Sequence, residues 1–367
     1  MNRRRLPVAL LAVLVTVLSG CASQSAAASR VASRRPAHKA AAGFLSYSQM
    51  ASVVAETMAT NNRANASLDL SLLKTYEAGS ALAIDAASYA ESRKVTGISC
   101  AYAPFGLKVL QAATLGSGAY PQRFVVLGTT YELPLRKGCT SAKSACPTPD
   151  SLFEFERSGP ASHWRIVLEP SADSGRIVDL ATNGSSARSL TAAQAASAQR
   201  VPHAAAVALQ SYGVTGRLGP LSAAEFTSKC WLLPSPRAAF EQYAKGGVSE
   251  SQIYSPMSGE VSLPLAGGAA LAIFVLGVKS TLVPASRGSS IDWISDPAAD
   301  PVTALLPSGQ YSRITERGQL ELGAVTSARG GFRIIGAYTG VTSIAGVKGS
   351  SPGGSGSGGV LVSYPIG

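Results

Sequence analysis

The sequence predicts an α+β protein in which helices precede antiparallel strands, and this order occurs twice along the chain. The spacing of apolar residues changes from a helical period to alternation after Cys100, and it does so again after Gly247. Of the 367 residues, 46% are hydrophobic and 14% are charged, so the chain can bury a core. Because helices and strands are segregated, the pattern favours two tandem helix-then-antiparallel-sheet domains behind a disordered tether.

Changes in composition divide the chain into five segments. Residues 1–20 have the form of a signal peptide, and residues 21–43, which are rich in Ala, Ser and Arg, have that of a flexible tether. The N-terminal domain is expected over residues 44–185 and the C-terminal domain over residues 186–346. The tail, residues 347–367, is dominated by Gly and Ser in its first half and cannot pack a core there.

Three helices are expected at the start of the N-terminal domain. Ser46 with Gln49 three residues later has the form of a capping box, and the helix that follows is expected to end at the pair Asn61-Asn62. A second helix is predicted over residues 69–79, with Asp69 as its N-cap. A third is predicted over residues 80–93.

The strands of the N-terminal domain are indicated by alternation. In Leu152-Phe-Glu-Phe-Glu-Arg, Phe153 and Phe155 share one face while Glu154 and Glu156 share the other. A Gly-Pro turn then leads to a strand with Trp164 on its apolar face. The predicted strands are residues 124–131, 152–157 and 164–169.

The C-terminal domain repeats this plan. A helix is expected over residues 190–212, interrupted or restarted at Pro202, and another over residues 236–245. Gly267-Gly268 has the form of a hairpin turn. An irregular excursion rich in Asp and Pro is expected over residues 284–309. The predicted strands are residues 260–265, 270–279, 311–314, 319–326 and 332–341.

The first 21 residues indicate where the protein is placed in the cell. Three arginines, Arg3 to Arg5, precede the apolar segment 6–17, which is too short to span a bilayer, and the run Leu18-Ser-Gly-Cys21 follows. This arrangement resembles the lipobox of bacterial lipoproteins. The resemblance implies that Cys21 is acylated and becomes the first residue of the mature chain, which would anchor the protein in membrane lipid. The positive-inside rule then places the mature part on the extracytoplasmic face of the cell membrane.

The formal net charge of +11 suggests nucleic-acid binding only until it is divided along the chain. Seven of the 32 basic residues lie within the first 39 residues, a stretch without any acidic residue. The remainder holds 25 basic and 21 acidic residues, with no basic stripe interleaved with aromatic residues. We therefore expect no nucleic-acid partner.

Besides Cys21, four cysteines remain in a chain that is expected to be exported, which suggests disulfide bonds. Cys139 and Cys146 flank a short loop, where a local bridge is favoured. Cys100 and Cys230 then either join the two halves or stay buried as small apolar residues. A zinc site is the weaker interpretation, because the cysteine spacing does not suit one.

Motifs of catalysis, cofactor binding and metal binding are weak. The histidines have no nucleophile motif around them, and no phosphate-binding glycine loop is present; the histidines are His38, His163 and His203. Asp292, Asp296 and Asp300 recur every four residues, but two prolines follow them and the glycine and glutamate of an EF-hand are missing. This pattern favours a solvated acidic loop. We therefore expect no catalytic site, no metal and no cofactor.

Two family resemblances extend the interpretation. The lipobox, the stretch 61–69, Leu82-Ala-Ile-Asp85 and the Phe-Glu-Phe…Trp-Arg-Ile-Val hairpin resemble actinobacterial lipoproteins of unknown function. Three helices before a curved sheet that ends in a Trp-Arg-x-Val strand resemble the nuclear-transport-factor-2-like cone, over most of residues 44–170 and more weakly over 190–345. Neither resemblance implies a catalytic residue in this chain.

These observations lead to two functional hypotheses. The favoured one is a non-enzymatic lipoprotein that binds a small apolar ligand in a cone cavity, or that acts as a scaffold for a protein of the cell envelope. The alternative is an enzyme with an acid/base pair in the cavity. Asp85 and Tyr89, four residues apart on a predicted helix, would form that pair, with Glu132 or Glu154 from the strands.

Overall fold

In the computed structural model the described residues are almost all helices, strands and their short connections. All five cysteines, with His38, Asp296 and Asp300, lie outside the described residues, so the disulfide, acylation and calcium interpretations stay untested. The same holds for the helix predicted over residues 236–245, of which the structure describes only the last two positions. The described residues are 44–94, 103–134, 150–172, 178–215, 217, 244–245, 247–286, 289–295, 303, 305–327 and 331–349.

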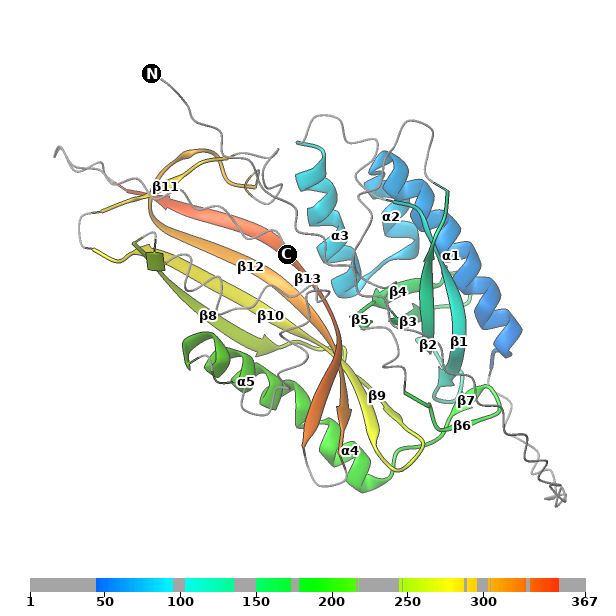
Figure 1. The fold of residues 1–367 in the computed structure, drawn as a ribbon. Helices are drawn as coiled ribbons and strands as arrows, with labels where there is room; N and C mark the ends of the chain where they lie inside the picture. Colours follow the sequence, from blue (N-terminus) through cyan, green and yellow to red (C-terminus); the bar gives the residue numbers. More distant parts are fainter. Residues whose placement is uncertain are drawn as a thin grey trace, which may run out of the picture. The chain divides into compact units, whose positions relative to one another are not determined.

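The first half of the described chain places three helices before its strands, as predicted (Figure 1). Helix α1 packs along β1, and α3 packs against β4. The helices are α1 (Tyr47–Ser67), α2 (Leu70–Tyr76) and α3 (Gly79–Ser92). The strands are β1 (Phe105–Leu115), β2 (Gln122–Glu132), β3 (Asp150–Arg157), β4 (Arg165–Leu168), β5 (Ser171–Ala172), β6 (Thr182–Asn183) and β7 (Ser186–Ala187).

Helix α1 begins as predicted and ends later than predicted. Ser46 and Gln49 form the capping box, each side chain bonding the other's backbone N–H. The helix passes through Asn61 and Asn62, because both amides have tertiary partners. Asn62 accepts from the Phe105 N–H (3.1 Å) and donates to the Phe105 carbonyl (2.7 Å), which ties α1 to β1. Leu68, in the left-handed region at φ 53°, ends the helix.

The second half again places helices before strands. The interruption at Pro202 is confirmed, because α4 ends at Ala198 and α5 begins at Val201. Strands β1, β8 and the short β5, β6, β7 and β11 were not predicted, and β11 lies within residues 284–309, which were expected to be irregular. In β1 the alternation is interrupted where the pairing with β2 shifts between Val109 and Gln111, and in β8 a run of polar residues follows Val248. The remaining elements are α4 (Ala192–Ala198), α5 (Val201–Thr215), β8 (Val248–Pro256), β9 (Val261–Pro264), β10 (Ala270–Pro284), β11 (Ile291–Trp293), β12 (Gly309–Thr326) and β13 (Phe332–Lys348).

Strand β12 is one strand where the sequence predicted two. It runs for 18 residues between β10 and β13, and a register shift at Arg317/Gly318 in its pairing with β13 absorbs the irregularity. The turn at Gly267-Gly268 is confirmed, with both glycines at positive φ. Strand pairing is antiparallel throughout the described sheet except between β1 and β7.

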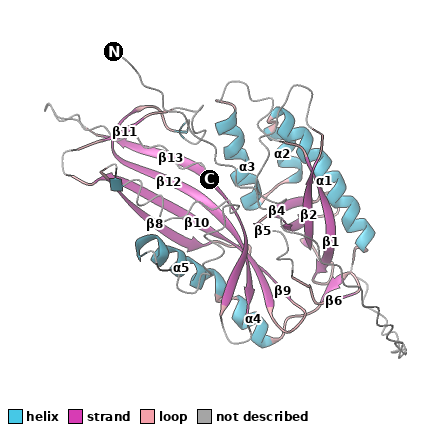
Figure 2. Ribbon diagram, in the orientation of Figure 1, coloured by secondary structure: helices cyan, strands magenta, loops and turns pink. Residues whose placement is uncertain are grey.

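The strands of both halves join into a single sheet (Figure 2). Its order is β6-β7-β1-β2-β3-β5-β13-β12-β10-β8, with β4, β9 and β11 paired off this path. The short strand β5 makes the junction, because Ser171 pairs with Ser151 of β3 and with Ala337 of β13. The α+β class with two helix-then-sheet halves is therefore confirmed. The domain boundary at residues 185/186 stays a prediction.

Three of the five apolar clusters among the described residues pack helices on strands or join the two halves. In the first half, the rings of Phe124 and Phe155 stack at 4.6 Å, and Trp164 meets Phe124 edge-on at 4.9 Å beneath α1. A second cluster contains residues of both halves, such as Leu152 and Ile273, so the halves share a core. A third cluster packs α4 and α5 on one face of β10 and β12, while α3 packs on the opposite face.

Candidate functional site

Four carboxyl side chains from four different segments meet where α3 packs against the sheet of the second half. We call this set the carboxyl cluster; its members are Glu77, Asp85, Glu169 and Glu321. Glu77 ends α2, Asp85 lies in α3, Glu169 follows β4, and Glu321 lies in the middle of β12. Tyr338 of β13, the cross-strand partner of Glu321, reaches the same place.

The connection between α2 and α3 brings the first two carboxyls against the sheet. The Ala78 N–H donates to the Ile166 carbonyl (2.8 Å), so the chain pairs briefly with β4 between the two helices. Gly79 then turns the backbone at φ +60°, and an added Cβ there would lie 3.3 Å from the Val167 carbonyl oxygen. Helix α3 therefore begins immediately after the chain's contact with β4. This start places Ser80 and Asp85 over β12 and β13.

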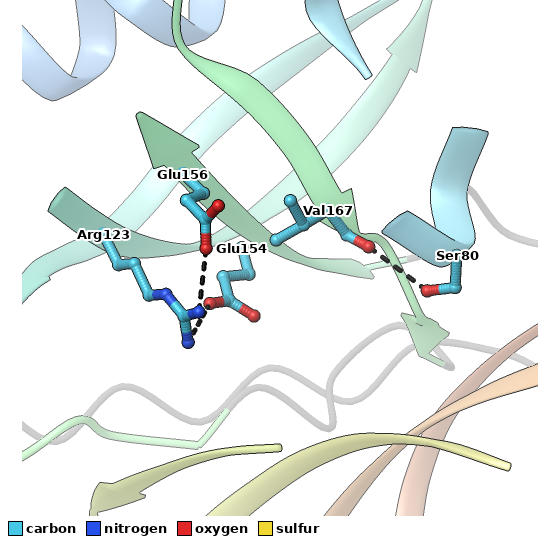
Figure 3. A network of polar contacts seen from close by, with 5 residues as sticks. All are labelled: Ser80, Arg123, Glu154, Glu156 and Val167. Atoms are coloured by element: carbon cyan, nitrogen blue, oxygen red, sulfur yellow. Dashed lines mark hydrogen bonds and ion pairs between the residues drawn. The ribbon is translucent and has the colours of Figure 1, made fainter. Parts of the chain in front are cut away.

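Hydrogen bonds connect the cluster across the two halves. The Ser80 hydroxyl lies 2.5 Å from Glu321 Oε1 and 3.2 Å from the Val167 carbonyl oxygen, the second of which Figure 3 shows. The Glu169 N–H donates to Glu321 Oε2 at 2.5 Å. The Tyr338 hydroxyl donates to Asp85 Oδ1. Each of these bonds joins a residue before position 170 to one in β12 or β13, except the Ser80–Val167 contact.

Glu77 is the least satisfied member of the cluster. Its side chain is 1% exposed, and among the described residues its carboxyl has a hydrogen-bonding neighbour only in the carboxyl of Asp85, a contact that needs a proton on one of the two groups. Burial, reinforced by the nearby charges of Asp85 and Glu321, raises the pKa of Glu77 well above its usual range. A carboxyl in such a place is stable only when it is protonated, because an unpaired buried charge is far more costly than a neutral acid.

The pKa values of the other three members of the carboxyl cluster are also raised. Burial raises the pKa of Glu321 to about 8, although the Glu169 N–H and Ser80 work against the shift. Burial and the surrounding carboxylates raise the pKa of Glu169 well above its usual range. Burial also raises the pKa of Asp85, opposed by the hydrogen bond from Tyr338. No described Lys or Arg makes an ion pair with any of these four carboxyls, so burial shifts each of them toward its protonated form.

Glu154 of β3 lies beside the cluster and, unlike its members, forms an ion pair with a described residue. Arg123 of β2 contacts Glu154 at 3.5 Å and Glu156 at 2.8 Å, as Figure 3 shows. Glu154 is 1% exposed, and burial still raises its pKa to about 8, because Arg123 offsets only part of the desolvation. Glu321 is among the charges that raise this pKa, which connects the ion pair to the carboxyl cluster.

The structure separates the acid/base pair suggested by the sequence. Asp85 and Tyr89 both lie buried in α3, but Asp85 accepts from Tyr338, whereas the Tyr89 hydroxyl donates to Asn65 Oδ1. Of the two suggested strand glutamates, Glu132 is exposed at the end of β2, and only Glu154 approaches the cluster.

Of the histidines considered as metal ligands, His163 and His203 lie in the described part of the chain. His163 and His203 are exposed. Among the described residues, no group of three or more His, Cys, Asp or Glu side chains has an arrangement that would hold a metal ion.

Sequence reasoning missed Glu77, Glu169, Glu321 and Tyr338 as members of a site. Glu321 stands between Leu320 and Leu322, which is the pattern of a strand with one polar face. Nothing in that alternation indicates that α3, a segment more than 200 residues earlier, covers the polar face. The only local signal for the site is that Glu321 is a charged residue in the middle of a predicted strand. No cation lies opposite it on either neighbouring strand.

The described structure is an α+β protein in which a buried carboxyl cluster joins two halves of one sheet. The chain belongs to the family described as a domain of unknown function, DUF8094, which matches residues 41–346. No curated protein matches the sequence. Among the described residues, no helix has both the length and the apolar character needed to cross a membrane.

Proposed function

We propose that this chain is a lipoprotein of the cell envelope, held on the extracytoplasmic face of the membrane by acyl chains on Cys21, and that it acts without catalysis as a scaffold or binding protein. The observation that carries the proposal is the run Leu18-Ser-Gly-Cys21 behind a short apolar segment and Arg3 to Arg5. Each buried acyl methylene contributes about 0.8 kcal/mol, so two or more chains retain a protein on the membrane.

The position of the family match is consistent with this arrangement. The match begins at residue 41, within the last three residues of the segment interpreted as a tether. A lipid anchor, a polar spacer and then a folded body is the order that a surface lipoprotein needs, because the body must clear the head groups to meet a partner.

The surroundings of Asp85 support a role without catalysis. A general acid or base must lie within hydrogen-bond reach of a substrate. Asp85 is buried beneath Tyr338, and Tyr89 is fully buried against Asn65. Their hydrogen bonds connect α3 to β13 and to α1, so both side chains serve to hold the fold together.

The interior of the first half supports a scaffold rather than an apolar-ligand pocket. We infer a nuclear-transport-factor-2-like cone there from α1 lying along β1 and from the Trp164-Arg-Ile-Val segment pairing with β3. The stacked rings of Phe124 and Phe155, with Trp164 edge-on, fill the space beneath α1. An envelope protein is therefore the favoured partner, and a small apolar ligand is the second choice.

Acylation tests the proposal directly. The full chain is produced in a bacterial host fed an alkyne analogue of palmitate, and the parent is compared with Cys21→Ser and with Ser19→Ala, which keeps a small residue before the cysteine. We expect label in the parent and in Ser19→Ala, no label in Cys21→Ser, and accumulation of the unprocessed parent with globomycin. Equal labelling of Cys21→Ser and the parent, or processing unaffected by globomycin, would refute the anchor.

A further inference from the structure

The outer part of β10, β12 and β13 carries a groove of about 420 Å³ that the carboxyl cluster does not involve. Three cationic side chains and three hydroxyl side chains line it, together with small and apolar residues; these six are Lys279, Arg313, Arg317, Thr281, Thr315 and Ser343. We call it the basic groove. Its volume is within the range of small-molecule sites.

The strand register explains why these side chains meet on one face. Lys279 pairs directly with Arg317, and Thr281 pairs with Thr315. Arg317 in turn pairs with Ser343 of β13. Residues paired across antiparallel strands point to the same side of the sheet, and every second residue along a strand does the same, which adds Arg313.

The charges of the groove are unbalanced. Lys279 and Arg317 stand directly opposite each other, an arrangement of like charges that destabilises a sheet. All three cations are exposed, and none makes an ion pair with a described residue. No acidic residue lines the groove. On the same face of β12, Glu321 lies four residues from Arg317, roughly 13 Å along the strand, beneath α3.

The donors fit a tetrahedral oxyanion better than a nucleic acid. Guanidinium groups bind phosphate oxygens in pairs, and serine and threonine hydroxyls supply further single donors. No described residue that lines the groove is aromatic, so this part of the chain offers no platform on which a base would stack. We propose that the basic groove binds a phosphate group of an organic ester, with Arg317 and Lys279 as the central contacts and Arg313 beside them.

This proposal goes beyond the envelope-lipoprotein proposal and does not depend on the acyl anchor. A bound phosphate would also remove the repulsion between Lys279 and Arg317, so ligand binding and sheet stability are coupled. The phosphate could belong to a lipid head group or to a soluble metabolite, and the two sources differ chemically. The first carries a phosphodiester and the second, most simply, a phosphomonoester.

Calorimetry on the full chain in a neutral detergent tests the assignment with two probes. Glycerol 3-phosphate represents the soluble monoester, and dihexanoylphosphatidylglycerol represents the lipid diester; succinate is the carboxylate control. We expect saturable binding of at least one phosphate probe, weaker binding of succinate, and loss of affinity as salt is raised. Preference for the diester assigns the groove to a lipid head group, and preference for the monoester assigns it to a soluble metabolite.

Two variants locate the binding. Arg317→Gln should weaken it about tenfold or more, because a charge-assisted contact is lost. Arg317→Glu should abolish binding while unfolding at no lower urea concentration than the parent, because the new carboxylate pairs with Lys279. Lys348→Gln, a cation of β13 outside the groove lining, is the matched control and should bind as the parent does. Binding that Arg317→Glu leaves unchanged, succinate bound as tightly as either ester, or no binding of either probe would overturn the proposal.

Discussion

Replacing Glu321 by glutamine should make the protein less sensitive to rising pH. The pKa of this carboxyl is about 8 in the folded chain, against 4.5 as its ordinary value. The folded state therefore holds a proton between these two values that the unfolded state releases. By linkage, the contribution of Glu321 to stability is complete below pH 4.5 and is lost as pH rises through 8.

The magnitude follows from the two pKa values. Between pH 5 and pH 7 the loss from Glu321 alone is about 2–3 kcal/mol, because each unit of pKa difference corresponds to about 1.4 kcal/mol. The side chain is fully buried, so solvent does not screen this effect. A loss of that size is a substantial part of the 5–15 kcal/mol that typically stabilises a folded protein.

Glutamine can satisfy the same neighbours without a titrating proton. Its Oε1 can accept from the Glu169 N–H, and its amide can donate to the Ser80 hydroxyl, which remains able to donate to the Val167 carbonyl oxygen. The Glu169 N–H therefore keeps its acceptor, and the second amide hydrogen of the glutamine is left to the neighbouring carboxyl oxygens. Glu321→Gln should equal the parent near pH 5 and exceed it at pH 7.

Urea unfolding at pH 5, 6, 7 and 8 measures the difference. The free energy of unfolding of the parent should fall across this series more steeply than that of Glu321→Gln, by about 2–3 kcal/mol between pH 5 and 7. Glu132→Gln, at an exposed position on β2, should follow the parent. Parallel curves for the parent and Glu321→Gln would show that this carboxyl is already ionised in the folded state.

Three further substitutions test the packing around the cluster. Gly340→Val should cost about 1–3 kcal/mol, because an added Cβ would lie 2.6 Å from Ile84 Cγ2, whereas Gly331→Ala, whose nearest contact is 3.5 Å away, should be nearly neutral in the same urea assay. Tyr338→Phe should steepen the loss of stability with rising pH, because it removes a hydrogen bond that lowers the pKa of its carboxyl partner; an unchanged slope would contradict this. Asp69→Ala should cost about 1 kcal/mol, because it frees two N–H groups at the start of α2, and unchanged stability would argue against the cap.

Local signals in the sequence were sufficient wherever a few neighbouring residues decide the structure. The capping box at Ser46, the N-cap at Asp69 and the restart at Pro202 were predicted correctly, because each depends on hydrogen bonds or dihedral angles within one turn. The end of α1 was predicted wrongly at Asn61-Asn62. Asparagine favours a helix end only when its amide has no better partner, and here β1 and α2 provide one.

The carboxyl cluster was decided by contacts that the sequence does not reveal. Asp85 was singled out, but with Tyr89, its neighbour on the same helix, rather than with Tyr338, which lies 253 positions away. Glu154 and Glu321 occupy the polar positions of alternating strands, a pattern typical of a half-exposed sheet. They are buried because β5 joins the two halves of the sheet and α3 covers β12 and β13.

The sequence by itself determined the class of fold and the helix-before-strand order of both halves, and it is the basis of the proposed lipid anchor. Those features depend on the period of apolar residues and on short motifs, and both are local. Only the tertiary structure decided that the halves share one sheet, that four carboxyls lose their water together, and that three cations gather without an acid. Solvation and charge balance depend on what covers each side chain, and that covering comes from distant parts of the chain.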